Sequence, residues 1–167
     1  MMIYPIKLLN EIKDRLIHSQ HTIAVAESVT SGHLQAAFSL ADEATFFYQG
    51  GITAYNLGQK SRHLLVEPIH AVKNNCVSAP IACDMAINVS RLFVSHYGVG
   101  ITGYAATIPE EGINDLFAFY AISLNGKIVH QAKITADKSS MLDAQLYYTE
   151  QVLNGLYSVL QANSNLV

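Results

Sequence analysis

Apolar spacing in the first part of the chain predicts helices that alternate with short buried strands. Residues 6–19 repeat apolar side chains at the spacing of one helix face, whereas residues 22–26 form a short apolar run. Such a run is typical of a strand covered on both faces. A polar turn at 27–32 and a second helical pattern at 33–40 follow. This stretch therefore predicts a strand, a tight turn and a helix.

The next segment combines strand-forming residues with glycine. Aromatic and β-branched residues at 46–55 predict a strand, which Gly50-Gly51 could interrupt with a bulge. Two short helical patterns follow at 58–65 and 69–74. We therefore expect the strand to lead into two short helices.

A longer helix is expected to begin at Ser78. Serine is a good helix cap, and Pro80 would fall in the first turn, where proline is tolerated. We expect this helix to run to about His96 and to end at Tyr97-Gly98. Its predicted core stripe consists of Ile81, Met85, Val89, Leu92 and Phe93.

The last part of the chain predicts another short buried strand at 99–102 and a hairpin. Apolar runs at 116–124 and 127–135 flank Asn125-Gly126, and Asn-Gly between such runs is a strong hairpin signal. A closing helix is expected at 142–160. Interleaved helices and strands with one hairpin predict an α/β fold with a mixed sheet and helices on its faces.

Composition narrows the class of protein. Of the 167 residues 50% are hydrophobic and 14% are charged, so the chain can bury a sizeable core and disorder is not expected. A net charge of −3 without any basic run argues against nucleic-acid binding. No apolar stretch is long enough to span a membrane, and no signal peptide is recognised. We read Cys76 and Cys83 as reduced thiols and expect a cytoplasmic protein.

Ligand sites of α/β folds lie in the loops that follow the carboxyl ends of the strands. One such loop holds Ser28, Thr30, Ser31 and Gly32, and another holds Thr102-Gly103. Two hydroxyls and backbone N–H groups at a helix N-terminus suit a phosphate or a carboxylate. Plain helix capping explains the same Ser and Thr residues, and both readings stay open.

Lys60 lies five residues after Tyr55, past a turn. A lysine held near a hydroxyl in a dry site can lose its proton and act as a base. The alternative is a solvated surface lysine, which spacing alone does not exclude. The seven histidines form no metal-ligand set, and no phosphate-binding or dinucleotide-binding glycine motif is present, so no cofactor is expected.

Four segments, in order, resemble one family. Residues 26–32 read A-E-S-V-T-S-G against the family's A-E-S-C-T-G-G, and residues 50–60 read G-G-I-T-A-Y-N-L-G-Q-K against G-G-V-V-x-Y-S-N-E-x-K. Residues 76–78 read C-V-S against G-A-V-S, and residues 101–105 read I-T-G-Y-A against V-T-G-I-A. The chain thus resembles the C-terminal domain of the CinA competence/damage-inducible proteins, the nicotinamide-nucleotide amidases.

The resemblance implies a three-layer α/β/α sandwich over a single domain, residues 1–167, without the separate N-terminal domain of longer members. It also implies hydrolysis of nicotinamide mononucleotide to nicotinate mononucleotide and ammonia, by a hydroxyl nucleophile and a lysine base, without a metal. The resemblance places Thr45, Lys60, Tyr55 and Ser28 in the catalytic group. It places Thr30, Ser31, Gly32, Thr102 and Gly103 in substrate binding.

Three departures from the family pattern affect the expected activity. The family nucleophile lies in a G-[AS]-S triplet, and Glu43-Ala44-Thr45 stands at that place, so the expected nucleophile is the Thr45 hydroxyl. The glycine-rich loop after Thr102-Gly103 is replaced by residues 105–112, which add Glu110 and Glu111, and negative charge opposes phosphate binding. A family arginine near the last helix has only Lys138 or Leu142 as candidates.

Two other functions stay open beside the amidase. The changed loop favours a catalytically inactive relative that binds a nucleotide or an unphosphorylated metabolite. The aromatic run Phe46, Phe47 and Tyr48 could instead form a subunit contact, although core packing explains it equally well. We expect a homo-oligomer whose partner is a small-molecule substrate, a pyridine nucleotide or related amide.

Overall fold

A computed structural model describes residues 3–137 and 140–164. Its centre is a five-stranded sheet in the order β2-β1-β3-β4-β5. The strands are β1 (Ile23–Glu27), β2 (Tyr48–Thr53), β3 (Tyr97–Gly103), β4 (Leu116–Leu124) and β5 (Lys127–Ala136). β1 pairs in parallel with β2 and β3, whereas β4 pairs antiparallel with β3 and β5, so the expected mixed sheet is confirmed.

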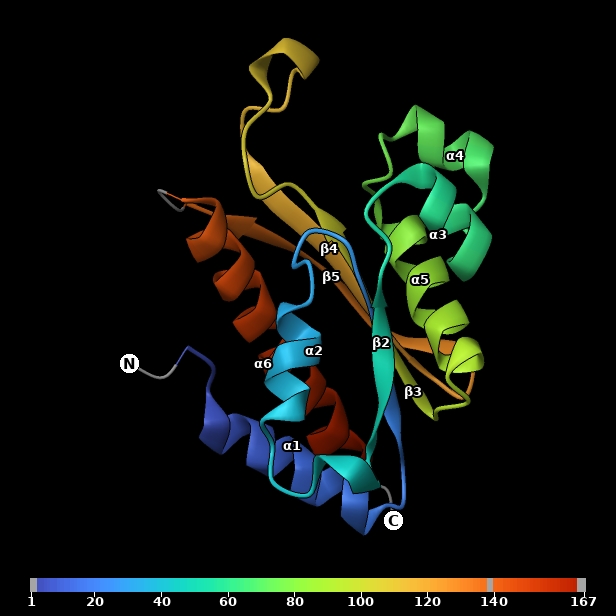
Figure 1. Ribbon diagram of the computed structural model, residues 1–167, viewed down its shortest axis with the longest axis vertical. Coiled ribbons are helices and arrows are strands. Elements are labelled where there is room, and N and C mark those ends of the chain that lie inside the picture. The colour runs from blue at the N-terminus through green and yellow to red at the C-terminus, as the bar shows by residue number, and fades with distance from the viewer. Residues whose placement is uncertain (1–2, 138–139, 165–167) are drawn as a thin grey trace.

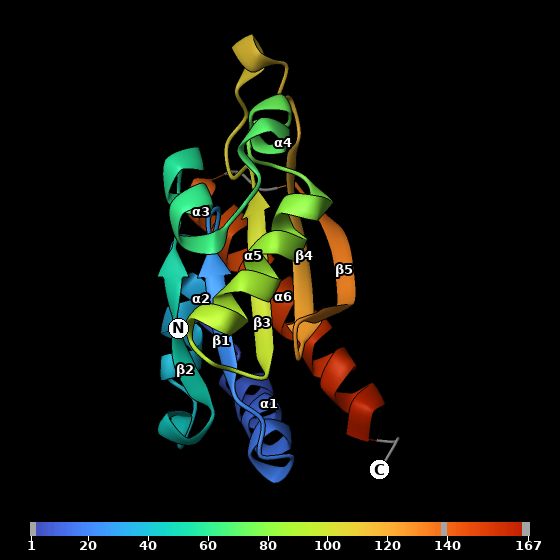
Figure 2. The ribbon, with the colours of Figure 1, turned by 90° about the vertical axis from the view of Figure 1, so that its right-hand side faces the viewer.

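Helices cover both faces of this sheet, which makes the fold a three-layer α/β/α sandwich (Figure 1). One layer contains α1 (Ile6–His18), α2 (His33–Ser39) and α6 (Met141–Ser164). The opposite layer contains α3 (Leu57–Leu64), α4 (Pro68–Lys73) and α5 (Ala79–Leu92), which face the viewer in Figure 2. Two short 3₁₀ turns, η1 (Ala44–Phe46) and η2 (Pro109–Glu111), lie in the connections.

Each helix layer encloses its own core against the sheet. Leu9, Ile12 and Leu16 of α1 are fully buried and belong to the larger cluster, which α2 and α6 complete. Ile81, Met85 and Val89 of α5 belong to the cluster on the other face. These residues recur at helical spacing, so the apolar pattern alone oriented both helices.

Glycine allows α5 to lie close against β3. A Cβ atom at Gly100 would lie only 2.4 Å from the carbonyl oxygen of Ala82. Larger side chains there would push the helix away from the strand. The Ala82 and Ala86 side chains on α5 are fully buried, so small residues on both elements define this contact.

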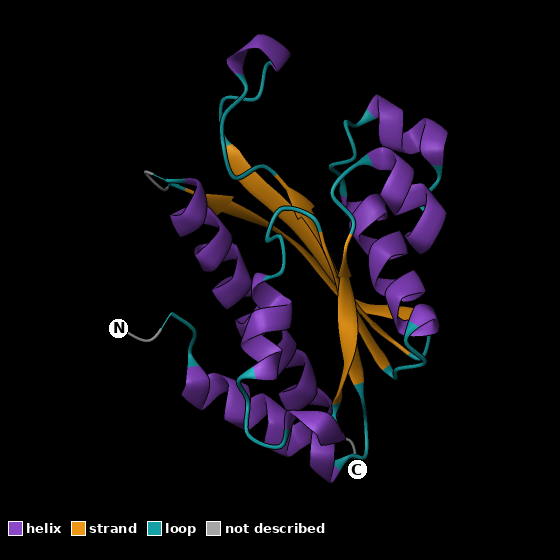
Figure 3. Ribbon diagram, in the orientation of Figure 1, coloured by secondary structure: helices purple, strands orange, loops and turns teal. Residues whose placement is uncertain are grey.

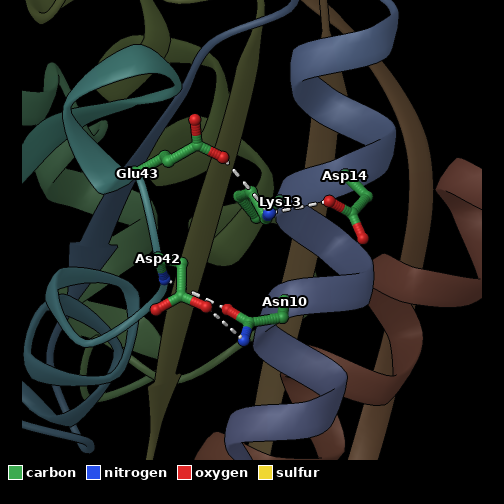
Figure 4. Close-up of polar contacts among 5 residues, drawn as sticks. All are labelled: Asn10, Lys13, Asp14, Asp42 and Glu43. Carbon is green, nitrogen blue, oxygen red and sulfur yellow. Dashed lines mark hydrogen bonds and ion pairs between the residues drawn. The ribbon is translucent and has the colours of Figure 1, made fainter.

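Polar contacts fix α1 to the connection between α2 and β2 (Figure 4). Asn10 donates to the Asp42 carboxylate at 2.9 Å and accepts from the Asp42 backbone N–H at 3.1 Å. Lys13 forms ion pairs with Asp14 at 2.7 Å and with Glu43 at 3.4 Å. The start of η1 is therefore held beside α1.

The long helix ends earlier than the sequence predicts. α5 stops at Leu92, Val94 adopts a left-handed φ of 52°, and Tyr97-Gly98 opens β3 instead of ending a helix. Leu92 is 51% exposed and is not part of the core stripe. The predicted helix end was wrong because Tyr97 pairs with Ile23 in the sheet, a long-range contact that local spacing does not reveal.

The two turn predictions are confirmed. Asn125 and Gly126 both have positive φ, at 50° and 77°, as a tight hairpin turn requires. The pairing of β1 with β2 is irregular between Ile23 and Ala24, which leaves Gln49 unpaired next to Gly50 with its φ of 128°.

Within the described residues no helix is long and apolar enough to cross a lipid bilayer.

Residues 104–115 form an arm that connects β3 to β4. The arm carries η2 and extends beyond the end of the sheet (Figure 3). An isolated bridge between Ile108 and Ile113 closes it, and the Tyr148 hydroxyl donates to the Tyr104 carbonyl at 2.9 Å to hold its base. The arm thus rises from the edge at which the parallel strands end.

Candidate active site

A pocket of about 280 Å³ lies at the carboxyl ends of the parallel strands. Its wall combines the ends of β1 and β3, the start of α3, the connection between α4 and α5, and the base of the arm. A larger and more open groove of about 890 Å³ lies between the N-terminal segment and α6, but the nucleophile and base candidates line the smaller pocket. The lining residues are Ser28, Val29, Tyr55, Lys60, Asn75, Cys76, Val77, Thr102, Gly103, Tyr104, Ala105, Ala106, Ile108 and Met141.

Lys60 and Ser28 meet inside this pocket. The Lys60 Nζ atom donates to the Ser28 Oγ atom at 2.8 Å and to the Tyr55 carbonyl oxygen at 3.3 Å. Lys60 is 1% exposed and Ser28 is 7% exposed. The capping residue Asn56, which accepts from the Gln59 backbone N–H, starts α3 so that Lys60 faces inward. A nucleophile and a base candidate are therefore within hydrogen-bond reach.

Burial changes the acid–base chemistry of Lys60. Removal of the ammonium from water lowers the pKa of Lys60, and the nearby Cys76 thiol opposes this shift in part. Among the described side chains that line the pocket, none is a carboxylate. The amine is thus easier to deprotonate than an ordinary lysine, as a general base requires.

Thr102 and Cys76 shape the opposite wall. The Thr102 hydroxyl donates to the Cys76 carbonyl at 2.7 Å. Asn75 and Cys76 both have left-handed φ values, at 48° and 60°, which are uncommon for residues other than glycine. Gly103 is required for another reason: a Cβ atom there would lie 2.5 Å from the Phe117 carbonyl.

The sequence profile of the CinA C-terminal domain matches residues 6–159. The chain belongs to the CinA C-terminal domain family. Protein MG115 of Mycoplasma genitalium is 26% identical over 151 residues, which are 90% of this chain and 96% of that protein. A putative competence-damage inducible protein of Streptococcus equi subsp. zooepidemicus is 28% identical over 96% of this chain, but the chain spans only 38% of that relative.

Solved structures of the CinA superfamily share the fold. A protein from Klebsiella pneumoniae superposes with a TM-score of 0.87 at 20% identity, covering 93% of this chain and 97% of that one. A protein from Escherichia coli gives a TM-score of 0.85 at 23% identity, covering 93% and 88%. At these identities the likeness establishes the fold alone.

In this CinA domain the start of α2 is not an open anion site. The fully buried Glu27 carboxylate accepts from the Thr30 hydroxyl at 2.6 Å and from the Gly32, Leu34 and Gln35 backbone N–H groups at 2.9–3.1 Å. Ser31 is exposed, and none of Thr30, Ser31 and Gly32 lines the pocket. An internal carboxylate thus occupies the helix N-terminus, and the substrate-binding role of these three residues stays a prediction.

The structure also does not bring Thr45 to the pocket. Thr45 lies in η1, which precedes β2, whereas Tyr55 and Lys60 follow the far end of that strand. The neighbouring Glu43 pairs with Lys13 on α1 (Figure 4). Within one chain, Thr45 and Lys60 thus lie at opposite ends of the sheet, and Ser28 is the hydroxyl beside the Lys60 amine.

Several pocket residues were not among the predicted site residues. Asn75, Val77 and Tyr104 come from connections whose path depends on tertiary packing, and Met141 comes from the start of α6. The motif segments 76–78 and 101–105 were the local signal for that wall. Lys138, a predicted arginine substitute, lies outside the described residues. Among residues 3–137 and 140–164, no three His, Cys, Asp or Glu side chains are arranged to hold a metal ion.

Proposed function

We propose that this protein is an amide hydrolase in which Ser28 is the nucleophile and Lys60 is the general base. The observation that carries the proposal is the 2.8 Å contact between Lys60 Nζ and Ser28 Oγ inside a ligand-sized pocket. The pocket lies where α/β folds place ligands, and its volume is near the lower end of the usual range of about 300–1,000 Å³.

The reaction divides into two acyl transfers. Neutral Lys60 takes the proton from Ser28 Oγ as the oxygen attacks the carboxamide carbon. The resulting ammonium then gives that proton to the departing nitrogen, so ammonia leaves and an acyl-serine ester is formed. Water, deprotonated by Lys60, hydrolyses the ester and returns Ser28 to its starting state, which is the serine–lysine version of a familiar acyl-transfer scheme.

Negative charge on the carbonyl oxygen needs hydrogen-bond donors. The backbone N–H groups of Val29 and Thr30 directly follow Ser28 and have no acceptor within the described part of the chain. The Gln145 side chain holds the Val29 carbonyl at 2.9 Å and so fixes this peptide. We assign these two N–H groups as the donors that stabilise the oxyanion.

The substrate proposal comes from the family resemblance. A CinA-type amidase would convert nicotinamide mononucleotide to nicotinate mononucleotide and ammonia. Tyr55 and Tyr104 line the pocket and would contact the pyridine ring. In this mechanism Lys60 carries out each proton transfer.

Ammonia release from nicotinamide mononucleotide tests the proposal. Ser28→Ala and Lys60→Met should each abolish release, whereas Thr45→Val should leave it unchanged because Thr45 lies at the other end of the sheet. Loss of activity in Thr45→Val with activity retained in Ser28→Ala would overturn the assignment of the nucleophile. Binding without ammonia release in the native protein would favour the alternative, a CinA-like protein that binds a nucleotide or other metabolite.

We also propose a cytoplasmic homo-oligomer. Both thiols are free, as expected in a reducing compartment. Of the three aromatic residues considered for a subunit contact, Phe47 is fully buried in the core, whereas Phe46 is 68% exposed. Light scattering of the native protein and of Phe46→Ser tests this: a native monomer would contradict the proposal.

A further inference from the structure

One acidic side chain of the arm reaches the wall of the pocket. The Asn75 side chain, which lines the pocket, donates to the Glu111 carboxylate at 2.9 Å. Glu111 lies in η2. Burial raises the pKa of Tyr104, another lining residue, and the charge of Glu111 adds to this shift. The negative charge of Glu111 is thus separated from the pocket by a single residue, Asn75.

The pocket also carries aromatic rings that suit a cation. Tyr55 is 65% exposed at the edge of the pocket, and Tyr104 lines it at the base of the arm. The faces of such rings attract cations, and a nearby carboxylate adds to that attraction. Ring and carboxylate together match a positively charged aromatic ligand.

Two described groups of a kind that commonly binds phosphate, a helix N-terminus and a lysine, are engaged in internal contacts. The Glu27 carboxylate occupies the N-terminus of α2 through three backbone N–H groups. Among the described residues that line the pocket, Lys60 is the only lysine or arginine, and its amine contacts Ser28 and the Tyr55 carbonyl. A dianionic phosphate placed near Glu111 would meet repulsion.

We propose that Glu111 sets the charge preference of this pocket, so that a cationic, N-substituted pyridinium carboxamide without a phosphate binds more tightly than its phosphorylated form. Nicotinamide riboside carries one positive charge on its ring and no phosphate, whereas nicotinamide mononucleotide adds a phosphate dianion. The inference rests on the proposed function for the reaction, but it concerns binding and can be tested without turnover.

The test measures the dissociation constants of nicotinamide riboside and nicotinamide mononucleotide by calorimetry, with Ser28→Ala protein so that neither compound is consumed. Low ionic strength, about 0.01 M, keeps exposed charges unscreened. The riboside should bind about tenfold more tightly, and Glu111→Gln should reduce that ratio about threefold, the size expected of one exposed charge. Glu110→Gln removes an equal charge from the same turn and should leave the ratio unchanged.

The result decides the inference separately from the proposed function. Tighter binding of the mononucleotide, no binding of either compound, or an equal effect of Glu110→Gln and Glu111→Gln would overturn the charge preference. Absence of ammonia release from both compounds with native protein would overturn the amidase proposal. A riboside preference that depends on Glu111 would still stand in that case.

Discussion

The Thr102 hydroxyl donates to the carbonyl oxygen of Cys76 at 2.7 Å, across 26 residues of sequence. This bond ties the end of β3 to a turn in which Asn75 and Cys76 have positive φ. For a residue other than glycine a positive φ is unfavourable in free energy, so the surrounding structure must hold the residue in that conformation. Thr102 is therefore a positioning residue that keeps one wall of the pocket in place.

Replacing Thr102 tests this role. Thr102→Val should lower kcat/KM about tenfold and destabilise the fold by about 1 kcal/mol, because the turn loses its hydrogen bond. Thr102→Ser keeps the hydroxyl and should restore most of both. Ammonia release and urea unfolding give the two numbers, and equal damage in the Ser and Val variants would contradict a positioning role.

Glu27 should be a main source of stability for the start of α2. Glu27→Gln replaces one carboxylate oxygen by an NH₂ donor that faces N–H groups, so the free energy of unfolding should fall by about 3 kcal/mol. Thr30→Val removes one of the four hydrogen bonds and should cost about 1 kcal/mol. Urea unfolding measures both, and a Thr30→Val loss as large as that of Glu27→Gln would argue against the capping role.

The pH dependence of activity should follow Lys60. The proposed mechanism requires the neutral amine, so kcat/KM should rise with pH as Lys60 loses its proton. Because burial lowers the pKa of Lys60, the midpoint should lie below the ordinary lysine value of about 10.4. Lys60→Arg should be inactive across the range, since a guanidinium stays charged. A pH–rate profile that falls as pH rises between pH 6 and pH 9 (about the accessible range for such assays) would exclude Lys60 as the base.

Stability should fall in mild acid because of His21. The His21 ring lies 4.8 Å from the His96 ring, and burial together with His96 lowers the pKa of His21. The unfolded chain, with a His pKa of about 6.5, then binds more protons than the native one, so stability is present above that pH and declines as pH falls toward the native value. His21→Phe should flatten this slope between about pH 5 and pH 7, whereas His63→Gln, an exposed histidine, should not. Urea unfolding at several pH values decides, and an unchanged slope in His21→Phe would refute the assignment.

Local sequence determined the layers of this fold. α1 follows directly from its apolar face, and the turn between β4 and β5 follows from Asn125-Gly126, because few residues other than Asn and Gly adopt left-handed φ readily. The predicted end of α5 was wrong, because Tyr97 belongs to the sheet, where it pairs with Ile23, 74 residues away. Short-range rules hold where a helix face or a tight turn decides the conformation.

The candidate site depended on tertiary structure. The sequence motifs named Ser28, Lys60 and Tyr55 separately, but only the crossover from β1 to β2 and α3 brings the hydroxyl and the amine together over 32 residues. Only the folded chain shows that Glu27 takes the helix N-terminus, that Thr45 lies at the far end of β2, and that Glu111 reaches Asn75. The physical reason is that helix faces and turns are set by neighbours along the chain, whereas the partners of a buried polar group are set by strand order and loop path.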